Sequence, residues 1–119
     1  MQFIDPTRET QSKLLALDHE GPVVMVNLLK FKPETGAASY AKYAAETTRF
    51  LKMVKGRLVY RGRYQMPFIG DGDWDEVLLV EYPSIKAFFK MVGDEGYQAI
   101  VHYRSEALLD SRLWVTCPE

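Results

Sequence analysis

The sequence contains a single cysteine, Cys117, and only two histidines. One cysteine excludes an intrachain disulfide, and no group of Cys and His residues has the spacing of a zinc site. An excess of charge of one sign is also missing, because 15 basic residues oppose 16 acidic ones. A chain with a net charge of −1 has no strong electrostatic attraction to phosphate backbones or anionic lipid. We therefore expect no metal, nucleic-acid or membrane partner.

Long apolar runs are absent as well. None is longer than Val23 to Val26, which ends at Asn27, whereas a membrane helix needs about 20 apolar residues. The N-terminus lacks the basic start and apolar segment of a signal peptide. The sequence therefore predicts a reduced, soluble, cytoplasmic protein. Its 119 residues suit one domain, because domains typically contain about 100–150 residues and need no disulfides at that size.

Hydrophobic patterning predicts an N-terminal helix followed by alternating strands and helices. The first helix begins at Asp5-Pro6, an N-cap and a first-turn proline, and runs to about Leu17. The later elements are a strand over 23–31, a helix from N-cap Ser39 to residue 54, strands over 57–66 and 74–82, helices capped at Ser84 and Asp94 and divided at Gly93, and a strand over 113–117. Gly56 is expected to close the long helix in the left-handed conformation.

This order of elements, β-α-β-β-α-β, is that of the ferredoxin-like arrangement. It is an α+β fold in which helices cover one face of a four-stranded antiparallel sheet. The strands over 23–31 and 74–82 are apolar on both faces. The uncovered face would expose a larger apolar patch than soluble monomers carry, and burial at ~25 cal/mol per Å² favours association. We therefore expect a homodimer through the sheet face, although alternation does not fix which face of each strand is covered.

Several segments together resemble a known family. They are Gly21 to Phe31, Tyr40 with Tyr43, Arg61-Gly62, Trp74-Asp75, Glu81 to Ser84, Tyr97 to Ile100, Arg104, and Asp110 to Leu113. This set is similar to domain-of-unknown-function family 1330, in the dimeric α/β-barrel superfamily. The resemblance covers about residues 21–117, so we interpret residues 1–20 as a helical extension and 21–119 as a single ferredoxin-like domain. It implies a homodimer whose sheets form a barrel with a cavity in each subunit, and no known activity.

Two polar residues on predicted core faces are candidates for a ligand site. Asn27 interrupts an apolar strand, and an unpartnered buried amide costs about 1–3 kcal/mol, so it either bonds its neighbours or faces a ligand. A step of 100° per residue places Arg104 within about 20° of Tyr97, on the apolar side of its helix. There Arg104 would extend over apolar surface, pair with Glu81 or another carboxylate, or hold an anionic ligand.

Three arginines and two aromatic residues offer further alternatives. Alternation places Arg57, Arg61 and Arg63 on one face of the strand over 57–66. They form a solvated row or, through Arg61, a positive wall suited to a small carboxylate. Trp74 and Tyr97 contribute packing in the core or an interface, or form a platform on which a flat ligand stacks.

Two classes of function therefore remain open. The first is an enzyme of monooxygenase, isomerase or lyase type, as in the barrel superfamily, acting without a cofactor on a small carboxylated or aromatic compound. Its ligand-binding residues would be Asn27, Arg61, Trp74 and Arg104, and its catalytic residues Glu81, a base if desolvated, and Tyr97, a source of a hydroxyl. The alternative is a non-catalytic small-molecule binding protein or a structural dimer.

Haem binding is the weakest alternative. Some barrel relatives combine asparagine, tryptophan and histidine in one pocket, and Asn27 and Trp74 could take two of those positions. The helical count turns His102 roughly 140° away from the apolar stripe, so no axial ligand is expected.

Overall fold

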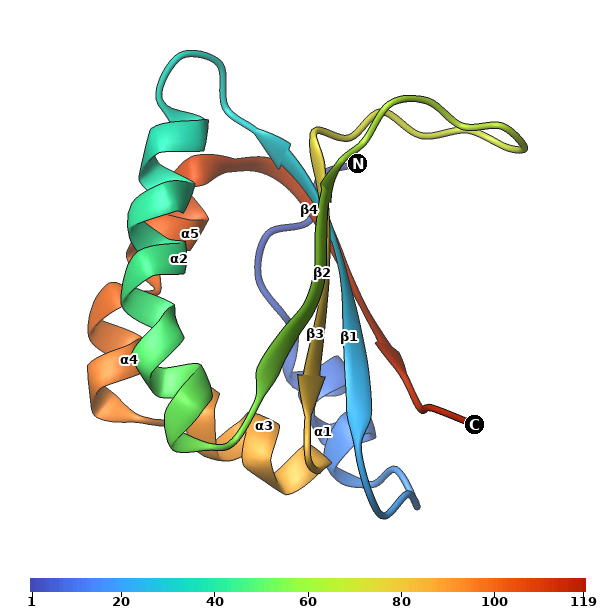
Figure 1. Ribbon diagram of the computed structural model, residues 1–119, viewed down its shortest axis with the longest axis vertical. Helices are drawn as coiled ribbons and strands as arrows, with labels where there is room; N and C mark the ends of the chain where they lie inside the picture. The colour runs from blue at the N-terminus through green and yellow to red at the C-terminus, as the bar shows by residue number, and fades with distance from the viewer.

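The computed structural model describes residues 1–119 and contains one four-stranded antiparallel sheet (Figure 1). The elements are α1 (Arg8–Leu15), β1 (Val23–Phe31), α2 (Gly36–Met53), β2 (Arg57–Arg63), β3 (Glu76–Tyr82), α3 (Ile85–Val92), α4 (Glu95–Ile100), α5 (His102–Ala107) and β4 (Leu108–Thr116). The strand order β2-β3-β1-β4 is that of the predicted ferredoxin-like α+β fold. No helix is long and apolar enough to span a membrane.

The two faces of the sheet have different environments. In Figure 1, α2, α4 and α5 form a layer on one side, which we call the helix-side face, and no helix layer covers the other, the open face. Along β1, Met25 and Leu29 are buried on the helix-side face, whereas Val26 and Leu28 are only half-buried on the open face. The predicted strand that is apolar on both faces is therefore confirmed, with one face covered.

Two helices begin elsewhere than predicted. The N-cap of α1 is Thr7, whose hydroxyl accepts a hydrogen bond from the backbone of Thr10 at 3.1 Å. A start at Asp5 is wrong because this reciprocal capping box fixes the first turn two residues later. The helix α2 begins at Gly36 rather than after Ser39, whose hydroxyl instead donates to the carbonyl of Tyr103 at 2.9 Å and links α2 to α5.

The end of α2 also differs from the prediction. The left-handed residue is Lys55, with φ of 62°, and Gly56 has no positive φ. Glycine is needed at position 56 for space, because a Cβ there would lie 2.4 Å from Cδ1 of Leu51. The prediction that the chain turns at Gly56 after α2 is therefore confirmed. The reason given for the glycine, a left-handed backbone conformation, is wrong.

The C-terminal half follows the predicted boundaries closely until residue 101. Ser84 caps α3, Gly93 ends it, and Asp94 caps α4. The helix then breaks at Val101, which separates α4 from α5, and β4 begins at Leu108 rather than residue 113. Leu108 is buried and belongs to β4, so the predicted start of this strand at residue 113 is wrong.

A β-bulge in β2 moves its arginines onto different faces. The register with β3 shifts between Leu58 and Tyr60. As a result Arg57 pairs with Glu81 on the open face, whereas Arg61 pairs with Leu78 on the helix-side face. The predicted single row of arginines is therefore wrong, because an extra residue in one strand reverses the alternation that follows it.

Residues 64–75 join β2 to β3 without regular structure and form what we call the arm. It projects away from the open face, on the side opposite to the helices (Figure 1).

Candidate functional site

Five polar side chains gather between the sheet and the helices. They are Asn27 on β1, Tyr40 on α2, Arg61 on β2, Glu76 on β3 and Arg104 on α5, and we call them the polar cluster. Asn27 and Arg61 lie in one row across the sheet, because both pair with the same residue of β3. Burial raises the pKa of Tyr40, and the charges of Arg104, Glu76 and Arg61 all act on its hydroxyl.

Glu76 is the buried charge of the cluster. Only 8% of the residue is exposed, and its carboxylate accepts hydrogen bonds from Nε of Arg61 at 2.5 Å and from Nη2 at 3.5 Å. The Arg61 side chain remains 51% exposed. A buried carboxylate needs a counter-charge, and the Arg61 guanidinium supplies it.

Two members of the cluster have unused hydrogen-bonding capacity. Asn27 is 9% exposed, and its one side-chain hydrogen bond is a long one, 3.4 Å from Nδ2 to the carbonyl of Met25. Tyr40 is 5% exposed and lacks a side-chain hydrogen bond. Every fully buried side-chain N or O atom of the protein has a partner, so the Tyr40 hydroxyl must touch a small solvent-reachable space.

Tyr97 lies next to the cluster in a pair of tyrosines. Its hydroxyl and that of Tyr43 are 2.7 Å apart, and the rings meet edge to face. Burial raises the pKa of Tyr97, and the Tyr43 hydroxyl raises it further. Tyr97 therefore remains a neutral phenol that donates or accepts hydrogen bonds and does not serve as a base.

Arg104 contacts the N-terminal segment rather than a carboxylate. Its Nη1 donates to the carbonyl of Ile4 at 2.7 Å. Its charge lowers the pKa of both Tyr40 and Tyr97, against the larger effect of burial, so the guanidinium lies near both hydroxyls. Of the sequence-predicted site residues, Asn27, Arg61, Tyr97 and Arg104 are thus brought together.

Glu81 and Trp74 lie elsewhere. Glu81 is on the open face, where its carboxylate accepts a hydrogen bond from Nε of Arg57 at 2.8 Å. Trp74 belongs to the arm and lies under the guanidinium of Arg112, 5.2 Å from its ring centroid. The structure does not bring either residue to the polar cluster.

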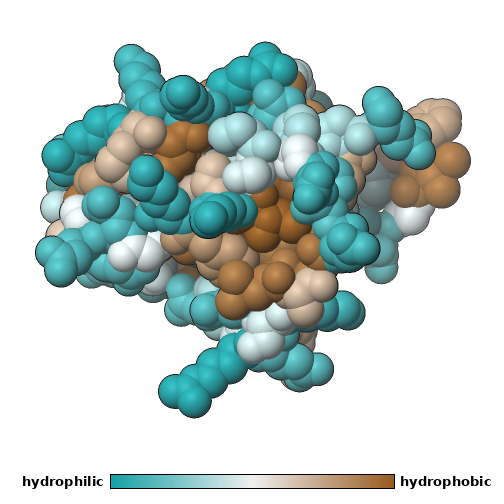
Figure 2. Space-filling view, turned by 90° about the horizontal axis from the view of Figure 1, so that it is seen from below, coloured by the Kyte–Doolittle hydropathy of each residue, from teal (hydrophilic) through white to brown (hydrophobic).

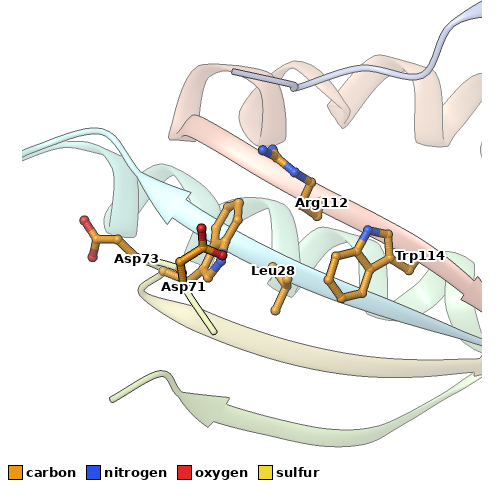
Figure 3. A pocket seen from close by; sticks show the side chains of 7 residues that line it. Leu28, Asp71, Asp73, Arg112 and Trp114 are labelled. Atoms are coloured by element: carbon orange, nitrogen blue, oxygen red, sulfur yellow. The ribbon is translucent and has the colours of Figure 1, made fainter. Parts of the chain in front are cut away.

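Trp74 instead lines a cavity of about 520 Å³ on the open face. The other lining residues are Leu28, Asp71, Gly72, Asp73, Arg112 and Trp114. Figure 3 shows Arg112 and Trp114 on β4 and Leu28 on β1, facing Asp71 and Asp73 of the arm. The guanidinium of Arg112 already pairs with Asp110 at 2.8 Å.

Sequence reasoning missed Glu76, Tyr40 and Tyr43 as functional candidates. Tyr40 and Tyr43 occupy the apolar positions of a helix. That spacing predicts core packing and does not indicate a role for their hydroxyl groups. Glu76 had a usable signal, because it is a carboxylate at the start of an apolar strand with the same parity as Leu78. No three His, Cys, Asp or Glu side chains come together as a potential metal site.

The sheet order and the single helix layer define a ferredoxin-like α+β protein. Residues 31–115 match the family described as Domain of unknown function (DUF1330). A protein of unknown function from Rhodopseudomonas palustris is 36% identical in sequence, with a TM-score of 0.94 over 100% of this chain and 98% of that one. The chain belongs to the DUF1330 family.

More distant structures share the fold. A dabb family protein with a ferredoxin-like fold from Mesorhizobium loti has 14% identity and a TM-score of 0.62, over 84% of this chain and 99% of that one. A dimeric ferredoxin-like protein of unknown function from Thermobifida fusca has 8% identity and a TM-score of 0.57, over 87% and 96% of the two chains. Comparison with curated proteins gives no significant match.

Proposed function

We propose that the protein is a homodimer, joined through the open face, in which each subunit binds a small carboxylate-bearing molecule at the polar cluster. The observation that carries the proposal is the set of unpartnered hydrogen-bonding groups on Asn27 and Tyr40, both at least nine-tenths buried, beside two guanidinium groups. Such a convergence of polar groups in a largely apolar interior is typical of a ligand site.

The balance of charge favours an anionic ligand. Arg61 and Arg104 bring two positive charges to the cluster, and Glu76 neutralises one of them. Arg104 uses only Nη1, on the Ile4 carbonyl, so its other guanidinium N–H groups are free to donate. A planar carboxylate matches the fork of donors that a guanidinium presents.

The charge state of Tyr97 supports a binding role for the neighbouring tyrosines. Because burial raises its pKa, the phenol keeps its proton across the physiological range and supplies a hydrogen bond to an anion. A second candidate function, an enzyme that takes a proton from the same ligand, is favoured by Glu76. Glu76 is a buried carboxylate whose charge acts on the Tyr40 hydroxyl, so it is the candidate base of the cluster.

Dimer formation is supported by the open face and by a relative. The half-buried valines and leucines of β1 and β3 on that face have no helix over them. The Thermobifida fusca structure of similar fold is described as dimeric.

The binding proposal is tested by calorimetry with small aliphatic and aromatic monocarboxylates, each paired with its methyl ester. We expect the acids to bind and the esters to bind at least tenfold more weakly, because the ester lacks the charge. Tyr40→Phe removes only the hydroxyl, and we expect it to weaken binding several-fold without lowering thermal stability. Tyr103→Phe, a tyrosine of α5 that is not part of the polar cluster, is the matched control. Equal affinity for acids and esters would refute the anionic site.

The catalytic alternative has a separate test. If Glu76 removes a proton from the ligand, Glu76→Gln abolishes turnover of the bound carboxylate while binding persists. Exchange of ligand C–H protons with deuterated water, followed by NMR, measures this step. Binding without any exchange in the wild type leaves the non-catalytic role.

A further inference from the structure

The geometry of the arm points to a specific form of this dimer. We propose that the arm of each subunit, residues 64–75, crosses the interface and buries its apolar tip, Phe68 and Ile69, on a second copy of the chain. This inference rests on the homodimer of the proposed function and adds that the arm holds the two subunits together.

The arm is fixed at its base. The backbone N–H of Tyr64 donates to the carbonyl of Asp75 at 3.1 Å, and the Tyr64 hydroxyl donates to the carbonyl of Gly72 at 3.0 Å. The Asp75 carboxylate accepts from the backbone of Phe31 at 2.8 Å, which ties the arm to the end of β1. Lys30 adds an ion pair with Asp73 at 3.1 Å. These contacts hold the arm in its projecting direction before any partner arrives.

The tip of the arm is apolar and almost fully exposed. Phe68 is 94% and Ile69 is 90% exposed, and Met66 is also exposed. In Figure 2 the arm forms the lobe at the right, with hydrophobic surface on it. Neighbouring large apolar side chains on a projecting segment are unfavourable in water, so they indicate a surface that a partner covers.

The length of the arm matches the spacing of packed sheets. Half of its 12 residues in extended conformation span about 20 Å, at about 3.3 Å per residue, whereas two sheets pack face to face about 10 Å apart. The tip therefore reaches past the partner's sheet and lies against the partner subunit rather than between the two sheets.

The charges of the open face favour a copy of the same chain over a different partner. Arg57 pairs with Glu81, Lys30 with Asp73 and Arg112 with Asp110, so these three basic side chains are paired within the subunit. A surface of this kind is compatible with itself, because an isologous interface brings the same groups from both sides. The paired basic side chains leave none of these three free to attract an acidic partner. The two-fold symmetry then engages both arms at once.

Site-specific crosslinking of the full chain tests the arm directly. The photoreactive amino acid p-benzoylphenylalanine replaces Phe68, and illumination is followed by denaturing electrophoresis. We expect a band of twice the subunit mass. The matched control places the same group at Leu15, an exposed apolar position on α1, and should give only the subunit band. If ultracentrifugation shows a dimer but position 68 gives no crosslink, the contact of the arm with the partner is refuted and the proposed dimer is retained. A monomer would overturn both.

A substitution gives a second, independent measurement. The double variant Phe68→Asp and Ile69→Asp should weaken dimerisation more than tenfold and leave the subunit folded, because these side chains are almost fully exposed in the single chain. Leu15→Asp is the control. Both tryptophans of the chain, Trp74 and Trp114, line the open-face cavity, so their emission reports on its coverage by the partner. An unchanged dissociation constant in the double variant would refute the proposal.

Discussion

The interior of the protein contains phenol groups where apolar side chains would otherwise pack. Tyr40, Tyr82 and Tyr97 each have their pKa raised, in each case chiefly because burial disfavours the phenolate. They are three of the seven tyrosines of the chain. Their rings belong to the buried core, and their hydroxyls bring polar atoms into it.

Raised tyrosine pKa values make the folded state sensitive to alkali. In the unfolded chain these groups lose their protons near pH 10, whereas the folded chain retains them. The unfolded state then binds fewer protons, so the free energy of unfolding is at its full value below about pH 10 and falls as the pH rises further. We expect an alkaline titration followed by phenolate absorbance to show three tyrosines that ionise only with unfolding. Their ionisation while circular dichroism remains native would contradict this.

The two partners of the Arg61–Glu76 ion pair are buried to different degrees, which predicts unequal effects of removing each one. Arg61→Met leaves a buried carboxylate without a counter-charge, and we expect a loss of about 1–3 kcal/mol in the free energy of unfolding. Glu76→Gln leaves an arginine that is half-exposed and turns to water, so the loss should stay below about 1 kcal/mol. Denaturant unfolding measures both. Equal losses, or a larger loss for Glu76→Gln, would contradict the unequal burial of Glu76 and Arg61.

At the scale of elements, the structure departs from the predicted pattern at the end of α2 and within β2. The turn after α2 holds a lysine in the left-handed conformation and a glycine in close contact with Leu51. The sequence Lys55-Gly56 therefore has its glycine one residue later than the backbone conformation favours.

This arrangement predicts opposite effects of substitutions at adjacent positions. Lys55→Gly removes the steric cost of a left-handed side chain and should stabilise the protein by about 0.5–1 kcal/mol. Gly56→Ala introduces a Cβ that meets Leu51 and should destabilise it by about 1–3 kcal/mol. Thermal unfolding of both variants in the same buffer provides the comparison. Stabilisation by Gly56→Ala would refute the close approach.

The fold was predictable from the sequence because apolar runs mark β1 and β3, and the long helix α2 keeps its apolar periodicity. The split of β4 from α5 was not, because Leu108 fits the apolar stripe of a helix as well as a strand. The face of Arg57 was not predictable either. The bulge is set by the pairing of β2 with β3, which the sequence of β2 alone does not specify.

For the candidate site too, the sequence revealed what one element shows by itself and missed what depends on the pairing of strands. Asn27 and Arg104 were found because each breaks an apolar pattern on its own element. Glu76 was missed because the acidic loop before it made its charge look like part of a solvated segment. The separation of Glu81 from Asn27 follows from pairing across β1 and β3, which alternation within one apolar strand does not specify.

At the scale of the whole molecule, the open face is the largest consequence of the fold. Val26 lies near its centre, on β1 between β3 and β4, and is half-buried in the single chain. In the proposed dimer a second sheet would cover the apolar side chains around it, so the proposal predicts that the stability of the protein depends on its concentration.

We therefore expect the melting temperature to rise with protein concentration, because association stabilises the folded state by mass action. Val26→Lys should abolish this dependence and yield folded monomers, since its side chain points away from the core. Ala45→Lys, at an exposed position of α2, is the control and should behave as wild type. A melting temperature independent of concentration over a hundredfold range, with monomers in ultracentrifugation, would argue against a sheet-to-sheet dimer.

The bulge near Val59 has a consequence for comparing related chains. A chain one residue shorter at this point would retain every arginine of β2. The side chains on one side of the deletion would, however, point to the opposite face of the sheet. Either Arg61 would leave Glu76 or Arg57 would leave Glu81. Length at this position, more than residue identity, decides which arginine enters the interior. An alignment of homologues that misplaces a gap here would assign the interior charge to the wrong residue.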